Sequence, residues 1–312
     1  MLSTLSVVLP IFALILAGWL ARRLGALGAA ATTELSRFVV SLALPALLFD
    51  IMAHARWADL WQPGFVAAFG LGSGVVFGLT LMLRLRQSRP LTDAVLDGLN
   101  AGYANTGFLG FPLAMVALGR DALGPTLIAT ILTVCVLFAV AIVMIEISLQ
   151  PESRPVRLVA KVGRSLLRNP LLVAPVLGSL VPLAGLSLPG PAESFLRLLG
   201  GAASPCALVA LGLFLADAQS AGLKRDTRST ALLVAFKLLL QPAVTWTLAV
   251  GVFGLSPAMT QTAVLLAALP TGTGPFMLAE LYRRDATTTS GVVLASTLGS
   301  VLTITAYLAW IG

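Results

Sequence analysis

Apolar runs of roughly 20 residues follow one another along almost the whole chain, separated by short polar breaks. As an α-helix, a run of this length matches the hydrocarbon core of a bilayer. The runs show no alternation of apolar and polar residues, which argues against a β-barrel. Only 11% of the 312 residues are charged, against about 25% in a soluble domain. The sequence therefore predicts an all-α polytopic membrane protein.

We expect ten membrane spans in two sets of five. The first five spans are Leu2–Leu20, Glu34–Ala53, Gly64–Leu83, Thr92–Leu118 and Gly124–Leu149. The second five are Leu166–Gly185, Ala192–Ala216, Ser229–Phe253, Pro257–Tyr282 and Thr287–Ile311. A polar connection divides the chain into two halves, 1–150 and 151–312. The first run has no basic leader, so we expect a true span and not a cleavable signal.

The two halves look like repeats of each other. Three pairs share an offset of 160 residues: Pro10 with Pro170, Gly18 with Gly178, and Pro45 with Pro205. Because five spans is an odd number, the second copy must enter the membrane upside down. The sequence therefore predicts two inverted five-helix repeats.

Lysine and arginine are distributed unequally between the two sides of this topology. One side holds Arg22, Arg23, Arg84, Arg86, Arg89, Arg154, Arg157, Lys161, Arg164, Arg168, Lys224, Arg225, Arg228, Arg283 and Arg284; the other holds Arg56, Arg120 and Arg197. The positive-inside rule places the first side in the cytoplasm and both termini outside. We expect a multi-pass protein of the cell inner membrane. Because the basic residues lie in loops, no nucleic-acid partner is expected.

Helix-breaking residues interrupt the fourth and ninth spans at corresponding places. The first break, after Asn100–Tyr103, is Asn105–Pro112, and the second is Leu269–Pro275. Paired broken helices are typical of a transporter's binding site. A new half-helix is expected to begin near Pro112 and near Pro275, and its N-terminal end favours an anion. The predicted ligand is a small organic anion.

We assign the residues of these breaks to two roles. Those expected to bind the substrate are Asn105, Thr106, Gly107, Thr271, Gly272 and Thr273. Those expected to shape the breaks are Pro112, Pro270 and Pro275. On the third span, Gly70, Gly74 and Gly78 predict a close helix-packing face.

Two charged residues in the second half need an explanation. Lys237, inside the eighth span, either balances a substrate carboxylate, acts in a proton or ion step, or extends its ammonium to the membrane surface. Glu280 follows the second break by about one turn, where protonation or a bound cation would couple transport to a gradient. Coupling to Na⁺, coupling to H⁺ and uncoupled flux all stay open. No cofactor or metal site is expected, because Cys135, Cys206 and His54 form no ligand set.

The break motifs carry a resemblance to a known family. Asn105–Pro112, the segment from Ala268 to Tyr282 and the pair Asn169-Pro170 resemble the auxin efflux carrier family. That family includes plant auxin transporters and bacterial malate or malonate permeases, and shares the bile-acid/sodium symporter-like fold. The resemblance implies ten helices with broken crossover helices 4 and 9, elevator-type alternating access and homodimers.

The resemblance also implies residue roles. Asn105 would bind the substrate carboxylate, Asn169 would line a cytoplasm-facing pocket, and Pro270 and Pro275 would shape the second break. Ala104 departs from the family, because plant members have proline there, and the central loop is short. Auxin itself is therefore unsupported, and an aliphatic mono- or dicarboxylate is favoured.

The predicted function is secondary active transport of a small organic carboxylate. The alternative is a sodium-coupled, bile-acid-like symporter of larger amphipathic anions. An intramembrane enzyme is disfavoured because no acidic pair lies at the midplane and the cysteines lack partners. A receptor or scaffold would have no use for the paired breaks.

Overall fold

The computed structural model describes residues 2–55, 61–150, 163–220 and 226–311. Within these ranges the regular elements are helices, joined at one point by an isolated β-bridge. The helices of the first half are α1 (Leu2–Arg23), α2–η1–α3 (Ala31–Phe38, Val39–Ala43, Leu44–Ala53), α5 (Pro63–Arg86), α6 (Leu91–Gly102), η2–α7 (Thr106–Gly110, Phe111–Leu118) and η3–α8–η4–α9 (Arg120–Ala122, Leu123–Thr130, Ile131–Leu137, Phe138–Ser148). Those of the second half are α11 (Pro170–Leu183), α12 (Gly190–Gly201), α13 (Ala203–Ser220), α14–η5–α15–η6 (Thr227–Ala235, Phe236–Leu240, Gln241–Thr247, Leu248–Val252), α16 (Pro257–Ala267), α17 (Gly274–Leu281) and α18 (Thr287–Ile311).

Six helices of the described residues are long and apolar enough to cross a membrane. They are Ala31–Ala53, Pro63–Arg86, Arg120–Ser148, Gly190–Asp217, Thr227–Val252 and Thr287–Ile311. Two shorter apolar helices, Thr106–Leu118 and Pro170–Leu183, accompany them. The prediction of a helical, polytopic membrane protein is confirmed. The count of ten spans and their division into inverted repeats stay predictions.

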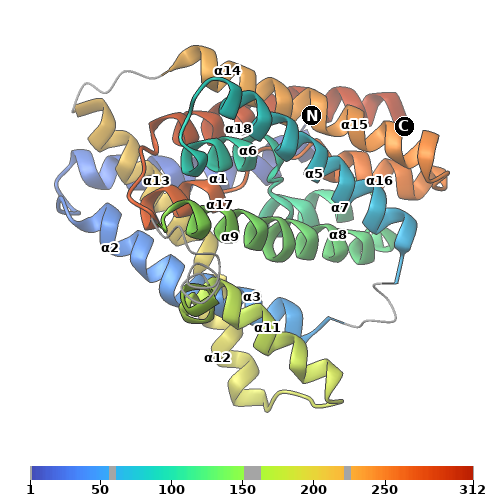
Figure 1. Ribbon diagram of the computed structural model, residues 1–312, viewed down its shortest axis with the longest axis horizontal. Helices are drawn as coiled ribbons and strands as arrows, with labels where there is room; N and C mark the ends of the chain where they lie inside the picture. Colours follow the sequence, from blue (N-terminus) through green and yellow to red (C-terminus); the bar gives the residue numbers. More distant parts are fainter. Residues whose placement is uncertain (1, 56–60, 151–162, 221–225, 312) are drawn as a thin grey trace.

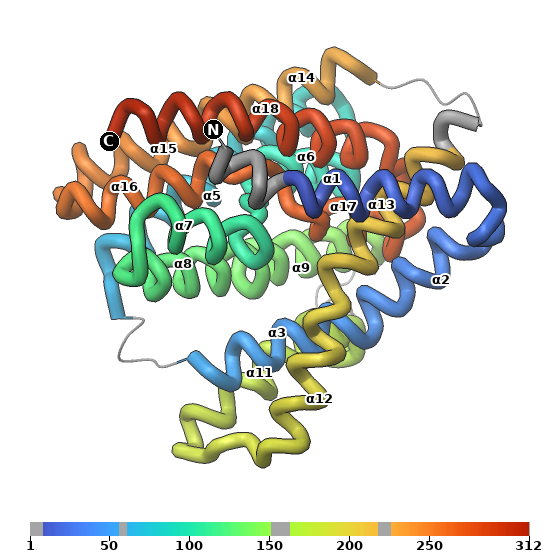
Figure 2. The backbone as a smooth tube through the Cα atoms, turned by 180° about the vertical axis from the view of Figure 1, so that it is seen from behind, coloured from blue at the N-terminus to red at the C-terminus, as the bar shows by residue number. Residues whose placement is uncertain are grey.

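The helices form a large bundle with a smaller lobe attached to it. Figure 1 shows α5, α6 and α14 to α18 in the bundle, with α3, α11 and α12 projecting below it. In the lobe α3 packs against both α11 and α12, and in the bundle α1 packs against α13. Figure 2 shows α2 and α13 leading from the lobe up to the bundle.

Glycines allow the closest of these helix contacts. A Cβ added to Gly18 of α1 would lie 2.2 Å from the carbonyl oxygen of Val209, and one added to Gly178 of α11 would lie 2.4 Å from that of Phe49. Both are backbone contacts that only a glycine permits.

The predicted packing face of α5 is wrong. A Cβ at Gly74 or Gly78 would meet no atom within 4 Å, and one at Gly70 would make only ordinary contact with Leu132. The close approach is instead at Gly72, whose added Cβ would lie 2.4 Å from the Thr245 hydroxyl. The glycines at spacing four therefore lie beside the contact face and not on it.

Candidate substrate site at the paired helix breaks

The two predicted breaks cross each other in the interior. Helix α6 ends at Gly102 and α16 at Ala267, and between them Ala104 and Thr271 form the isolated antiparallel bridge. The Asn105 N–H donates to the Pro270 carbonyl at 2.9 Å, and the Gly272 N–H donates to the Tyr103 carbonyl at 3.1 Å. Backbone that leaves a helix inside a membrane needs such partners, because lipid supplies none. Each break therefore satisfies the other.

New half-helices begin beyond each break, and the first of them begins earlier than predicted. α7 starts at Phe111 with Pro112 in its first turn, but the π-helical turn η2 precedes it from Thr106. The expectation that this half-helix begins near Pro112 is thus corrected to Thr106, because the wide π turn extends the helix backwards. In the second break α17 starts at Gly274 with Pro275 in its first turn, as predicted.

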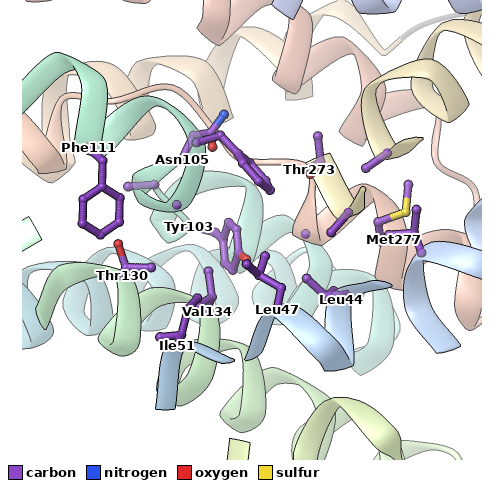
Figure 3. A pocket seen from close by; sticks show the side chains of 18 residues that line it. Leu44, Leu47, Ile51, Tyr103, Asn105, Phe111, Thr130, Val134, Thr273 and Met277 are labelled. Carbon is purple, nitrogen blue, oxygen red and sulfur yellow. The ribbon is translucent and has the colours of Figure 1, made fainter. Parts of the chain in front are cut away.

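A cavity of about 130 Å³ lies where the breaks cross. Figure 3 shows side chains of the two breaks on one side of it, with α3 and the α8–η4 helix opposite. Its lining residues are Val39, Leu44, Leu47, Ile51, Tyr103, Ala104, Asn105, Gly107, Phe108, Phe111, Thr130, Val134, Ala203, Ala207, Gly272, Thr273, Gly274 and Met277. Most of this lining is apolar, and none of it carries a charged side chain.

Three residues of the breaks that line this cavity carry polar side-chain atoms without a hydrogen-bond partner in the described ranges. The Asn105 amide, the Thr273 hydroxyl and the Tyr103 hydroxyl have no hydrogen-bond partner among the described residues. The Thr130 hydroxyl is already engaged, since it donates to the Thr126 carbonyl at 2.8 Å. The free groups are neutral hydrogen-bonding groups at the place where the sequence predicted substrate contacts.

Backbone N–H groups add to this set of donors. The first N–H groups of a helix have no intrahelical acceptor and carry the positive end of its dipole. In the first half-helix the Thr106 N–H donates to the Ala104 carbonyl, and the first helical hydrogen bond runs from the Leu109 N–H to the Asn105 carbonyl. In the second half-helix the first helical hydrogen bond runs from the Met277 N–H to the Thr273 carbonyl. The residues ahead of them include Gly107 and Gly274, which line the cavity. The positive ends of two half-helices therefore meet at one apolar space.

Several predicted residues shape the site without lining the cavity. The Thr271 hydroxyl donates to the Asn100 carbonyl at 2.7 Å, and the Thr271 N–H donates to the Ser296 hydroxyl at 3.1 Å. Thr106 is fully buried, and its hydroxyl has no partner in the described part of the chain. Thr271 therefore fixes the crossing, and neither threonine lines the cavity. Pro112, Pro270 and Pro275 are likewise absent from the lining.

Asn169 lies apart from the crossing cavity. It is the N-cap of α11, where its side-chain oxygen accepts a hydrogen bond from the Leu171 N–H at 3.0 Å. The structure thus gives this residue a capping role. Its predicted contact with substrate stays a prediction.

Lys237 and Gln241 donate hydrogen bonds to the C-terminal ends of the two half-helices that precede the breaks, α16 and α6. Lys237 is fully buried, and its Nζ donates to the carbonyl oxygen of Ala267, the last residue of α16, at 2.7 Å. Gln241 Nε2 donates to the carbonyl of Gly102, the last residue of α6, at 3.1 Å. The interpretation of Lys237 as a side chain reaching the membrane surface is therefore wrong. It also does not line the cavity, so a direct contact with substrate is not seen.

Tyr103, the aromatic residue that flanks the first break, was not among the residues assigned to substrate binding, yet it lines the cavity. Its ring packs closely against both glycines of the second break: added Cβ atoms at Gly272 and Gly274 would lie 2.8 Å and 2.6 Å from ring carbons. Leu44 and Leu47 of α3 also line the cavity without a polar or helix-breaking signal in the sequence. The aromatic residue directly before the first break was the one available clue.

Comparison with known proteins identifies the family. The model of the membrane transport protein family matches residues 4–308. The chain belongs to this family. The resemblance to auxin efflux carriers is thereby confirmed, and the chain is a membrane transporter and not an enzyme.

Two relatives cover nearly the whole chain. A "Putative malonate transporter" of Rhizobium meliloti (strain 1021) is 32% identical over 303 residues, which is 96% of this chain and 93% of the relative. An "Uncharacterized transporter" of Methanothermobacter thermautotrophicus (strain ATCC 29096 / DSM 1053 / JCM 10044 / NBRC 100330 / Delta H) is 26% identical over 303 residues, or 95% of each chain.

Proposed function

We propose that this family member is a secondary carrier of a small dicarboxylate of the malonate type, which it binds where the two breaks cross. The observation that carries the proposal is the cavity between two half-helix N-terminal ends, with free donors and no charged side chain. Such ends bind carboxylates without a cationic side chain. Two ends facing one space suit a substrate with two carboxylates.

The size of the cavity supports a small substrate. About 130 Å³ is well below the range of roughly 300–1,000 Å³ that drug-sized ligands occupy. A bile acid would need a much larger space, which disfavours the alternative of a carrier for large amphipathic anions. The relative named for malonate is consistent with a substrate of a few atoms.

Within the site we assign the direct contacts to a few groups. Asn105 and Thr273 would donate to the carboxylate oxygens, with the backbone of Gly107 and Gly272 beside them. The Tyr103 hydroxyl would complete the set. Thr106, Thr271 and the three prolines would hold the geometry, and Asn169 would contact substrate only in another conformation.

The repeat architecture also belongs to this proposal. Gly18 meets Val209 and Gly178 meets Phe49. Gly18 and Gly178 are 160 residues apart in the sequence, and so are Phe49 and Val209. Equivalent contacts at one offset support two inverted repeats, 1–150 and 151–312, of five spans each. We further propose elevator-type movement, homodimers, and an inner-membrane location with both termini outside.

Ligand-induced stabilisation tests the substrate and the site together. We expect malonate to raise the melting temperature of the purified protein by mass action. Malate, acetate and a bile acid, each with and without sodium, serve as comparisons. The Asn105→Ala variant should bind malonate about tenfold to a hundredfold more weakly, as expected for loss of a hydrogen bond to a charged group.

Asn100→Ala is the matched control, because it removes the same side chain outside the cavity, where its Nδ2 donates to the Thr289 hydroxyl at 2.9 Å. It should lower the melting temperature through loss of that hydrogen bond, by about 1 kcal/mol, and still respond to malonate. An unchanged malonate response in Asn105→Ala would refute the site. A response to the bile acid alone would refute the substrate class.

A further inference from the structure

A second hollow lies between the first part of the α2–η1 helix and the end of α17. It has a volume of about 410 Å³ and is lined mainly by polar side chains. Its lining residues are Thr33, Ser36, Arg37, Val40, Ser41, Glu280, Leu281 and Arg283. Glu280, the residue predicted as a coupling site, therefore lies here and not at the crossing.

The hollow and the crossing cavity are both lined in part by residues of η1 and α17. α17 packs against α2 and η1. Val39 and Met277 line the cavity, whereas Val40 and Glu280 line the hollow. Val39 and Val40 are adjacent, and Met277 and Glu280 are three residues apart, so each pair lies within one helical turn. The two spaces thus follow one another along a single seam, and the hollow lies on the side where the positive-inside rule places the cytoplasm.

One buried group in the hollow has no partner. Ser36 is only 4% exposed, and its hydroxyl lacks a hydrogen-bond partner within the described residues. A buried hydroxyl without a partner carries a desolvation cost, which a ligand in the hollow would remove.

Arg283 gives the second indication of a ligand. It has φ +51°, in the left-handed region that favours glycine. The Arg284 N–H bonds back to Ala279 and the Arg283 N–H to Glu280, the pattern of a helix end that usually carries glycine at this position. The Arg283 side chain makes no ion pair in residues 2–55, 61–150, 163–220 and 226–311. A free cation at a glycine position suggests that the side chain is kept for binding.

We propose that this hollow is an outer binding site for the same small dicarboxylate. By outer we mean nearer to the cytoplasmic surface than the crossing cavity, which the substrate enters from the hollow. The inference rests on the proposed function. Arg283 and Arg37 would attract the anion, and the Ser36 hydroxyl would donate to one of its oxygens. Arg37 is already paired with exposed Glu34 at 2.9 Å, so Arg283 is the principal cation.

Calorimetric titration with malonate tests this proposal, in nanodiscs of neutral phosphatidylcholine. The parent protein should show two classes of site, a tight one and a weak one. Asn105→Ala should weaken the tight site about tenfold to a hundredfold and leave the weak site unchanged. Arg283→Gly and Ser36→Ala should keep the tight site and each weaken the second about tenfold, and the effect of Arg283→Gly should be larger at low salt than at high salt.

Arg283→Gly also separates binding from folding, because glycine suits this backbone better than arginine. Its melting temperature should not fall. Ser88→Gly is the matched control, since Ser88 has φ +58° at the end of α5, outside the hollow. It should behave like Arg283→Gly in melting and like the parent in malonate binding.

The outcomes distinguish the two proposals. One class of site in the parent, weakened in Asn105→Ala and unchanged in Arg283→Gly, would refute the outer site and leave the proposed function standing. No malonate binding at all would refute both. The same titrations with anionic lipid added test whether a lipid headgroup occupies the hollow. Lipid binding would overturn the outer substrate site if it depends on Arg283 and is not displaced by malonate.

Discussion

Replacing Gly274 by alanine tests whether Tyr103 and the second break form one packed unit. The added Cβ would lie 2.6 Å from Cζ, 2.8 Å from Oη and 2.9 Å from Cε1 of Tyr103. Carbon atoms normally approach to about 3.5–4.0 Å, so the ring must retreat by about 1 Å. Tyr103 is only 5% exposed and packs on Phe138 with ring centroids 5.6 Å apart. We therefore expect the ring to move into the crossing cavity, which it lines.

Overpacking of this kind costs about 1–3 kcal/mol. A large domain loses roughly 2–4 °C of melting temperature per kcal/mol, so Gly274→Ala should melt several degrees below the parent. Because the displaced ring enters a cavity of about 130 Å³, malonate stabilisation should also fall. Removal of the ring should relieve the clash. In a double-mutant cycle with Tyr103→Val, we expect a favourable coupling of about 1–2 kcal/mol.

The melting temperature and the malonate response, measured on the same detergent-purified samples, provide the assay. Gly74→Ala is the control, because an added Cβ there meets no atom within 4 Å; it should be neutral or slightly stabilising. The reasoning fails if Gly274→Ala destabilises the protein equally with and without the Tyr103 ring.

Two further predictions concern the helix contacts and the buried lysine. Gly18→Ala and Gly178→Ala should each cost about 3 kcal/mol, since the clash is with a carbonyl of a neighbouring helix and not with a movable side chain; melting temperatures like that of Gly74→Ala would contradict this. Lys237→Met should lower the melting temperature by the equivalent of about 1–3 kcal/mol, because the Ala267 carbonyl loses its donor, and should still respond to malonate. A normal melting temperature with no malonate response would instead place Lys237 in substrate binding.

The positions of the breaks could be read from the sequence, because asparagine, glycine and proline interrupt a helix wherever it lies. The chain does leave its helices at Gly102 and Ala267 and does pair the two breaks. The restart of the first half-helix could not be placed as well. A π turn at Thr106 follows no simple residue pattern, whereas Pro112 marks an ordinary first turn.

The packing faces were harder to predict, for a physical reason. In a soluble helix a polar face marks the side turned to water. A membrane helix is apolar on the side facing lipid as well, so its sequence does not mark the inward side. The glycine that faces the partner helix is therefore Gly72, and not one of the glycines spaced four apart, Gly70, Gly74 and Gly78. The same lack of signal hid Leu44 and Leu47 of α3 from the predicted site.

The crossing also explains how the proposed anion site works without a cationic side chain. Two broken helices bring four helix ends to one place, two positive and two negative. The negative ends, at Gly102 and Ala267, are held by Gln241 and Lys237 from one neighbouring helix. The positive ends, each equivalent to about half a charge, face the cavity with their donors free. A cationic side chain in the cavity would have to be desolvated whenever the site is empty, whereas the end of a helix carries only about half a charge and costs less to leave unoccupied. In the proposed site, helix dipoles would therefore allow the substrate to leave as well as to bind.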